Sequence, residues 1–300
     1  MSASDQGRTR VIVNPAAAAG RALQRVAPIR PLLNDAWSSI DWCVSRSAQH
    51  VADLCNDAAT KHYTRVIVAG GDGTVHYALR GLTHSTTALG ILPVGTGNDF
   101  AAAAGMPLKT VAAASALVSG AIVCADLAAA GDIPYCCVAG IGMDTPALTY
   151  INRSRLRRGK LLYQLAAVKT LLTYEACALH IEVNGAAIQE HVLFASFCNT
   201  PTYAGGNRIA PLASIFDAQL DYCVFLDRPL FQRFAIFARL KLGRHLGHRG
   251  VRSGVADTIS ISSALPAPVT LDGELTQITT PVEIRLMPGA LRLICPRRAA

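Results

Sequence analysis

The first third of the chain alternates between short apolar runs and stretches with helical periodicity. Apolar runs lie at 10–15, 38–46, 65–70 and 88–95, and helical patterns lie at 16–33, 47–62, 74–84 and from 98 onward. Strands that alternate with helices, each strand a continuous apolar run, are typical of a parallel sheet covered on both faces. The pattern predicts an α/β domain with a doubly wound parallel sheet over residues 1–122.

From about residue 123 the pattern becomes that of a β protein. Strand-like segments joined by Gly, Pro or Asn-Gly turns occur at 121–142, 177–200, 219–227, 257–263, 267–275 and 280–288. Asn-Gly between alternating segments at 182–188 indicates a hairpin, and helical stretches interrupt the strands at 159–174 and 229–247. We predict a second, mostly antiparallel β domain over 123–284, with the C-terminal residues, about 285–300, as candidates to return to the first domain.

Composition narrows the class of protein. Of the 300 residues, 51% are hydrophobic and 16% are charged, which is enough apolar material for two cores. No run reaches the roughly 18 apolar residues of a membrane span, and the first residues lack the apolar region of a signal peptide. The nine cysteines show no CxxC spacing, and Cys136 and Cys137 are adjacent. This favours reduced thiols in a cytoplasmic protein over a disulfide framework or a zinc site.

Three turns follow the ends of predicted strands: Asn-Pro at 14–15, GGDGT at 70–74 and GTGND at 95–99. In parallel sheets ligands bind beyond the carboxyl ends of the strands, so these turns are expected to share one edge. Glycines let main-chain N–H groups approach a ligand closely, and the helix N-terminus that follows favours a phosphate. Asp72 would repel a bare phosphate unless a divalent cation lay between them. A tight strand-to-helix turn with Asp72 as a cap is the alternative.

GGDGT, LPVGTGNDFA at 92–101, NTPTYAGGNRIAP at 199–211 and LDGE at 271–274 occur in this order. Together they resemble the diacylglycerol-kinase-type lipid kinases, most closely the two-domain bacterial members; sphingosine and ceramide kinases share the catalytic module. The resemblance spans nearly the whole chain and implies a nucleotide-binding first domain. It also implies an ATP- and Mg²⁺-dependent kinase that transfers the γ-phosphate to a hydroxyl of a diacylglycerol-like or sphingoid lipid. A NAD-kinase-like enzyme and a non-catalytic nucleotide- or lipid-binding family member remain the alternatives.

The resemblance also implies roles for individual residues. The nucleotide site would comprise Asn14, Ser45, Gly70, Gly71, Asp72, Gly73, Thr74, Thr96 and Asn98. The catalytic Mg²⁺ would be organised by Asp72, Asp99 and Asp126, although Asp99 could simply cap the helix that follows it. A structural Mg²⁺ would be held by the Asp217 carboxylate and the carbonyl groups of Ser214 and Gln219.

LDGE supplies the two carboxylates expected to act in catalysis, Asp272 and Glu274. Strand alternation would place both on the same side, two residues apart. One would accept the proton of the lipid hydroxyl and the other would face the metal. The resemblance leaves open which is the base, and we favour Glu274. The alternative is an ordinary hairpin turn, since Asp-Gly is a favoured turn sequence.

The chain departs from the family pattern at several positions. Ala17, Ala18 and Ala19 replace a Ser/Gly/Lys-rich turn, Tyr77 replaces an acid, Ala102 replaces an arginine, and Ala218 replaces the glycine after the aspartate of the structural metal loop. These departures motivate the non-catalytic alternative, which the intact acids oppose.

The charge of +8 favours an anionic partner: a nucleic acid, a nucleotide or a lipid surface. Basic runs at 152–160 (Arg153, Arg155, Arg157, Arg158, Lys160) and 241–252 adjoin apolar helices, one of which carries Phe231, Phe234, Phe237 and Leu240. We expect a lipid substrate at a membrane surface, and a cytoplasmic protein that touches the inner face of the membrane peripherally. Nucleic acid is not expected, because aromatic residues do not interleave with the basic ones. Solvated loops are the alternative, and a homodimer remains open.

Overall fold

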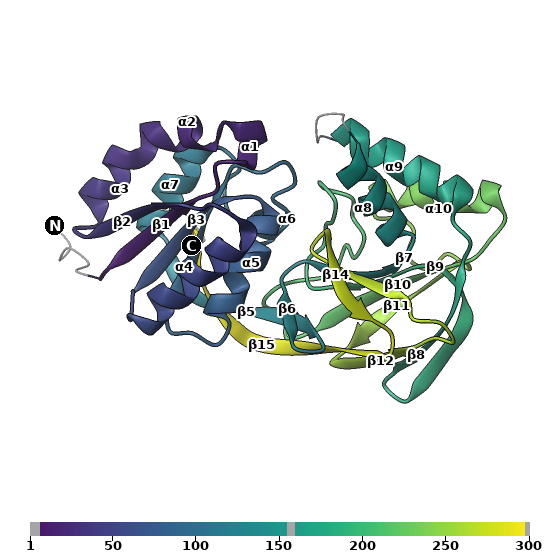
Figure 1. Ribbon diagram of the computed structural model, residues 1–300. Helices are drawn as coiled ribbons and strands as arrows, with labels where there is room; N and C mark the ends of the chain where they lie inside the picture. The colour runs from purple at the N-terminus through teal and green to yellow at the C-terminus, as the bar shows by residue number, and fades with distance from the viewer. Residues whose placement is uncertain (1–6, 155–159, 298–300) are drawn as a thin grey trace. The chain divides into compact units, whose positions relative to one another are not determined.

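The computed structural model describes residues 7–154 and 160–297 and divides into two compact units (Figure 1). One unit, here called the α/β unit, comprises Met1–Asp126 and Gly289–Ala300, and the other, the β unit, comprises Leu127–Pro288. The sequence placed these two boundaries about four residues earlier, near 122 and 284. The first boundary falls inside β5 (Ala121–Ala130) and the second inside β15 (Val282–Cys295).

The α/β unit is built on a parallel sheet with the strand order β2-β1-β3-β4-β15. Its first four strands are β1 (Thr9–Val13), β2 (Ile40–Val44), β3 (Arg65–Gly70) and β4 (Ala88–Pro93). Every residue of β1, β3 and β4 is buried, which explains why each reads as an unbroken apolar run. β15 returns to this unit through Leu293, which pairs with Leu89 of β4.

Helices cover both faces of this sheet. They are α1 (Ala17–Gly20), α2 (Ala22–Val26), η1 (Ala27–Ile29), α3 (Arg30–Ala36), α4 (Ala48–Thr60), α5 (Asp72–Leu82), α6 (Asp99–Ala103) and α7 (Thr110–Ser119). α3 packs against α7, and α4 packs against α5 on the opposite face (Figure 1). The predicted doubly wound α/β domain is therefore confirmed.

The single helical stretch predicted over 16–33 was wrong, because the structure breaks it into four short pieces. Ala18 and Ala19 have positive φ angles of 56° and 55°, the left-handed conformation that ends helices. Pro28 and Pro31, which cannot donate to a preceding turn, stand in the first turns of η1 and α3.

In its described residues the β unit consists of antiparallel strand pairs with three helices. The strands are β6 (Ile133–Tyr135), β7 (Val138–Gly142), β8 (Cys177–Val183), β9 (Ala186–Cys198), β10 (Leu220–Leu226), β11 (Val251–Ala256), β12 (Thr258–Ser262), β13 (Pro268–Leu271) and β14 (Glu274–Thr279). The helices are α8 (Asp144–Arg153), α9 (Lys160–Thr173) and α10 (Leu230–Lys241). The predicted, mostly antiparallel domain is confirmed, as is the hairpin at 182–188, where Asn184 and Gly185 both have positive φ.

The core of the β unit is formed mainly by side chains of its strands and includes the fully buried Tyr135 and Phe197. The Tyr135 hydroxyl donates a hydrogen bond to the Phe197 carbonyl at 3.1 Å, which satisfies its polar end. α8 packs on β7 and α9, and α10 packs on α9, so the helices form a layer of their own. No helix within 7–154 or 160–297 has both the length and the apolar character needed to cross a bilayer.

Candidate functional site

The turns after β3 and β4 touch through their backbones. A Cβ atom on Gly95 would lie 2.4 Å from the Cα atom of Gly71, and one on Gly71 would lie 3.0 Å from the Cα atom of Gly95. Glycine is thus required at these positions because two backbone segments of the chain approach each other, rather than because of an unusual φ angle. The approach places the N-terminus of α5 beside the turn that leads into α6.

The turn after β1 joins the same edge. The side-chain amide group of Asn14 donates to the Thr74 hydroxyl at 2.9 Å. The side-chain oxygen of Asn14, Oδ1, accepts from the Ala16 N–H group at 3.0 Å. Gly70 is also constrained, because a Cβ atom there would lie 2.2 Å from the Thr74 hydroxyl oxygen. The expectation that the three turns share one edge of the sheet is confirmed.

Asp72 and Asp99 occupy the first positions of neighbouring helices. Asp72 begins α5, yet its Oδ1 accepts the N–H group of Phe100 in α6 at 3.1 Å. Asp99 begins α6 and is buried. The cap on its helix is Asn98, whose φ of 59° is left-handed and whose side chain makes two hydrogen bonds to Gly95, at 2.9 and 3.1 Å. The carboxylate of Asp72 therefore binds the backbone of the neighbouring helix.

The remaining residues predicted for this edge have different surroundings. Ser45 follows β2 and is buried, and its hydroxyl donates to the Val13 carbonyl at 3.5 Å. Thr96 is exposed on the loop after β4. Asp126 comes from β5 rather than from any of the three turns, and its Oδ1 accepts the N–H group of Gly289 at 2.7 Å.

Two departures from the family pattern have a structural consequence at this edge. The Ala18 and Ala19 backbones take left-handed conformations, each at a cost of about 1–2 kcal/mol for a residue with a Cβ atom. Tyr77, where the family has an acid, is half-buried, and the Arg80 guanidinium stacks on its ring 4.6 Å from the centroid.

The LDGE stretch forms a tight hairpin in the β unit. Leu271 of β13 pairs with Glu274 of β14, and the two turn residues, Asp272 and Gly273, both have positive φ, 52° and 79°. Two positive φ angles in a two-residue loop are the signature of a type I′ turn. The prediction that strand alternation puts both carboxylates on one side was therefore wrong, because Asp272 belongs to the turn and not to a strand.

Asp272 turns inward and binds backbone amides. Its carboxylate accepts the N–H groups of Cys136 at 3.1 Å, Cys137 at 2.7 Å and Val138 at 3.2 Å, and its own N–H group donates to the Val138 carbonyl. Successive backbone N–H groups that converge in this way form an anion-binding nest. Asp272 is only 7% exposed, whereas Glu274 is half-buried at the start of β14. The two carboxylates thus differ in their exposure to solvent.

The loop predicted to hold a structural metal contains two side-chain-to-backbone hydrogen bonds. Asp217 Oδ1 accepts the Gln219 N–H group at 3.1 Å, and the Ser214 hydroxyl accepts the Phe216 N–H group at 3.2 Å. Ala218 adopts a φ of 54°, the left-handed conformation that suits the family's glycine. The Asp217 carboxylate and the backbone carbonyl groups of Ser214 and Gln219 are oxygen donors of the kind that Mg²⁺ prefers, so the chemistry of these residues fits the ion. Burial, together with the charge of Asp217, raises the pKa of nearby Asp221 to about 6.

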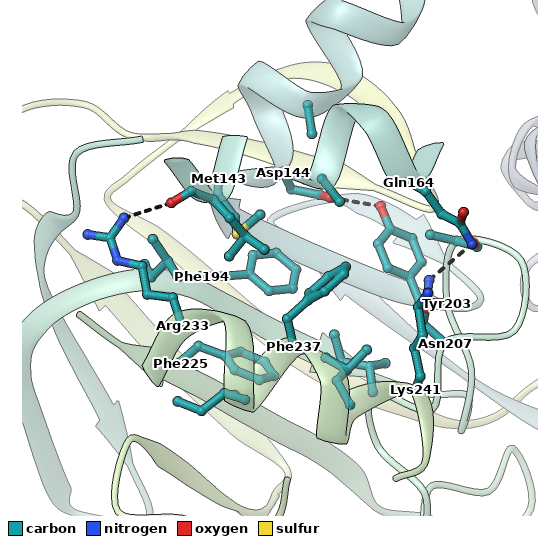
Figure 2. Close-up of a pocket in the computed structure, with 18 of the residues that line it drawn as sticks. Met143, Asp144, Gln164, Phe194, Tyr203, Asn207, Phe225, Arg233, Phe237 and Lys241 are labelled. Carbon is teal, nitrogen blue, oxygen red and sulfur yellow. Dashed lines mark hydrogen bonds between the residues drawn. The ribbon is translucent and has the colours of Figure 1, made fainter. Parts of the chain in front are cut away.

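The β unit also encloses an apolar cavity of about 160 Å³. Its walls come from α8, α9, α10, β9, β10 and the loop that contains Tyr203. Figure 2 shows Phe194, Phe225 and Phe237 lining the cavity, with the first two rings stacked at 5.9 Å. Phe237 and Leu240, which belong to the apolar helix beside the second basic run, both line this cavity.

Several polar side chains border the cavity, among them Asp144 and Arg233. Asp144, the first residue of α8, accepts a hydrogen bond from the Tyr203 hydroxyl at 2.7 Å (Figure 2). It also accepts one from the Thr270 hydroxyl at 2.8 Å. Burial raises the pKa of the Asp144 carboxyl, and the two hydrogen bonds only partly oppose this shift. Arg233 donates to the Leu171 and Tyr174 carbonyls and to Asp227, and so holds α10 against the end of α9.

Sequence reasoning did not single out Asp144. A local signal was available, since Asp144 follows the glycine-rich end of β7 and begins a helix, the same order of features as at Asp72. The cavity itself could not be found in this way, because its lining comes from segments up to about a hundred residues apart.

Comparison with known proteins agrees with this architecture. The model of the diacylglycerol kinase catalytic domain matches residues 8–130, and that of the YegS C-terminal NAD kinase beta sandwich-like domain matches residues 137–295. The diacylglycerol kinase of Mycobacterium tuberculosis (strain ATCC 25618 / H37Rv) is 28% identical, covering 97% of this chain and 96% of that protein. That of Bacillus subtilis (strain 168) is 25% identical, covering 89% of each.

Solved structures from Bacillus anthracis str. Sterne have the same fold. One superposes with a TM-score of 0.84 at 25% identity and covers 98% of this chain and 99% of that chain. Another, a diacylglycerol kinase, superposes with a TM-score of 0.80 at 23% identity, over 99% and 100% of the two chains. The two-domain fold and the matched models define a class of phosphotransferases. The chain belongs to the diacylglycerol-kinase family of lipid kinases, and it is a lipid kinase.

The raised pKa of Asp144 predicts a pH-dependent penalty on stability. The folded protein keeps this proton to a higher pH than the unfolded chain does, so the wild type loses stability as pH rises above about 4. Asp144→Asn keeps an acceptor for the Tyr203 and Thr270 hydroxyls but cannot ionise. We expect the free energy of unfolding of the variant, relative to wild type, to increase between pH 4 and pH 8. Urea denaturation at several pH values measures this difference, with the exposed Asp132→Asn as control; a pH-independent difference would contradict the assignment.

If Mg²⁺ binds at the Asp217 loop, the pKa of the neighbouring Asp221 carboxyl should depend on the Mg²⁺ concentration. A divalent cation on the Asp217 carboxylate would offset the repulsion that raises the pKa of Asp221, so added Mg²⁺ should lower that pKa from about 6. Carboxyl ¹³C NMR titrations with and without Mg²⁺ measure the shift. In Asp217→Asn the pKa of Asp221 should be lower from the outset and insensitive to Mg²⁺. A wild-type midpoint that Mg²⁺ leaves unmoved would count against the metal site.

Proposed function

We propose that this lipid kinase transfers the γ-phosphate of ATP to a hydroxyl of a diacylglycerol-like or sphingoid lipid whose hydrocarbon chain enters the cavity of the β unit. The cavity carries the proposal, because a largely apolar wall with phenylalanine, leucine and isoleucine side chains suits an alkyl chain. The M. tuberculosis and B. subtilis relatives are named diacylglycerol kinases, which supports the same class of substrate.

The edge formed by the turns after β1, β3 and β4 is the proposed nucleotide site. The first-turn N–H groups of α5 point out of the helix N-terminus, where the helix dipole favours phosphate. The contact between Gly71 and Gly95 leaves no side chain to block the approach of the phosphates. Asp72, Asp99 and Asp126 would hold Mg²⁺, which, when bound, offsets the negative charge of the phosphates during transfer.

In the LDGE hairpin we assign the proton-accepting role to Glu274. Asp272 is fixed by three backbone N–H donors and lies beneath the turn, so its carboxylate cannot swing toward a hydroxyl without losing those bonds. Glu274 is half-buried at the edge of the same hairpin and has a longer side chain. Asp272 is then a positioning residue that sets the shape of the turn from which Glu274 projects.

A membrane surface is the proposed source of the lipid. Phe231 of α10 is 72% exposed, Leu242 is 62% exposed and Leu172 of α9 is 52% exposed, which is unusual for large apolar side chains in water. Lys241 and Arg244 lie exposed beside Leu242 and suit anionic headgroups. Of the other basic run, Arg155, Arg157 and Arg158 lie outside the described residues. His245, counted with the second run, is buried and donates to the Ile209 carbonyl.

A transfer assay tests the proposal. Purified protein is incubated with labelled ATP, Mg²⁺ and either diacylglycerol or sphingosine in detergent micelles, and we expect label in a chloroform-soluble product. Asp72→Asn and Glu274→Gln should each lower turnover at least about a hundredfold while leaving the fold intact, as expected for loss of charge stabilisation and of a general base. Label in NAD, or nucleotide binding without any transfer, would contradict the proposal.

The cavity is tested separately with a pair of matched variants. Ala167→Phe would place a ring in the cavity, whereas Ala187→Phe adds the same bulk on the exposed start of β9. We expect Ala167→Phe to raise KM for a long-chain lipid while sparing a short-chain soluble analogue, and Ala187→Phe to leave both unchanged. Equal kinetics of the two variants on long-chain lipid would rule out the cavity as the chain-binding site.

A further inference from the structure

Two adjacent cysteines and the LDGE aspartate form a compact cluster in the β unit. The Sγ atoms of Cys136 and Cys137 are 3.8 Å apart, and Cys136 Sγ is 3.6 Å from Asp272 Oδ2. The ligand atoms of all three residues lie within 4.8 Å of one another, and all three residues are buried. The proposed kinase mechanism uses neither sulfur atom. We propose that Cys136, Cys137 and Asp272 form a site for Zn²⁺ or a similar thiophilic cation, and that its occupation inhibits the kinase.

The spacing of the three ligand atoms carries this proposal. With Zn–S bonds of about 2.3 Å and a tetrahedral angle, two sulfur ligands are about 3.8 Å apart. A sulfur and a carboxylate oxygen, with a Zn–O bond of about 2.1 Å, are about 3.6 Å apart. The observed distances, 3.8 Å and 3.6 Å, match both values. The third distance, between Cys137 Sγ and the Asp272 carboxylate oxygen, is at most 4.8 Å and would shorten on binding.

The chemistry of the donor set selects the kind of cation. Two thiol groups and one carboxylate suit Zn²⁺, Co²⁺ or Cd²⁺, whereas Mg²⁺ prefers oxygen ligands alone. Binding would release the two thiol protons to solvent, since sulfur coordinates as thiolate. Three protein ligands leave a fourth tetrahedral position for water. The sequence did not predict this site, because the two cysteines lack CxxC spacing and the third ligand lies some 135 residues away.

The surroundings hold the ligands in place. Asp272 Oδ1 accepts the N–H groups of Cys137 and Val138, and Oδ2 accepts the Cys136 N–H group while it faces Cys136 Sγ, so the carboxylate is oriented through both oxygens. Outer hydrogen bonds of this kind fix the orientation of metal ligands. The cluster lies directly beneath the turn at Asp272 and Gly273, where Gly273 is half-buried, so a cation would enter past this turn.

Inhibition follows from the shared aspartate. A cation bound to Asp272 Oδ2 and two sulfur atoms would crosslink the hairpin turn to Cys136 and Cys137 and restrict the movement of Glu274, which follows two residues later. This consequence rests on the proposed function, because it matters only if the hairpin takes part in phosphoryl transfer. The existence of the site does not depend on that role.

Cobalt spectroscopy tests the site without reference to activity. Full-length protein, kept reduced by a non-chelating phosphine, is titrated with Co²⁺, and we expect a sulfur-to-cobalt charge-transfer band that saturates at one equivalent. Zn²⁺ should abolish the band and Mg²⁺ in excess should not. Cys136→Ser and Cys137→Ser should each weaken binding at least about tenfold, since loss of an outer-shell partner alone costs that much. Cys177→Ser, a half-buried thiol of β8 in the same unit, is the matched control and should bind like wild type.

The outcomes separate the two parts of the proposal. Wild-type affinity in both Cys136→Ser and Cys137→Ser, or no charge-transfer band at all, would overturn the site. In the lipid-transfer assay, Zn²⁺ at the concentration that displaces Co²⁺ should inhibit wild type and Cys177→Ser but spare Cys136→Ser and Cys137→Ser. Equal inhibition of all four, or of none, would overturn the regulatory role. A failure of the proposed kinase activity cannot be mistaken for loss of the site, because the cobalt band is read without substrate.

Discussion

The backbone contact between Gly71 and Gly95 is the constraint on which the proposed nucleotide site depends. It brings two strand-to-helix turns so close that neither can carry a side chain at the point of contact. The N-termini of α5 and α6 are then neighbours, which lets Asp72 of one helix accept a hydrogen bond from Phe100 of the other. A pair of helix N-termini with two carboxylates beside them combines an attraction for phosphate with a place for a divalent cation.

Asp272 has a comparable role in the β unit. Its buried carboxylate accepts three successive N–H groups, two from the segment between β6 and β7 and one from the first residue of β7. Its own left-handed backbone forms part of the turn between β13 and β14. The same geometry that makes it a poor candidate for a mobile base makes it a good anchor for the hairpin. It also brings a carboxylate oxygen next to two thiols, so the requirements of the turn and those of a zinc ligand coincide at one residue.

The sequence predicted features that depend on local pattern. The buried parallel strands are legible as apolar runs, and the Asn184-Gly185 turn is legible because few other residues accept two positive φ angles. Predictions from the sequence were wrong where tertiary contacts override the local pattern. Alanine gives no sign that Ala18 and Ala19 turn left-handed, and alternation misplaced Asp272 because a turn, not a strand, carries it. The cavity and the cluster at Cys136 depend on pairings across the β unit, which no local signal encodes.

The central claim, that the turns after β1, β3 and β4 form the nucleotide site, is tested most directly by mapping backbone amide shifts. ¹⁵N-labelled protein is titrated with ATP and Mg²⁺, and NMR chemical-shift changes are assigned to residues. We expect the largest changes at Asn14, at 71–74 and at 95–99, with smaller changes in the same amides when Mg²⁺ is omitted. Saturable binding whose largest changes fall on the β unit instead, or no change at these amides at saturating ATP, would contradict the account.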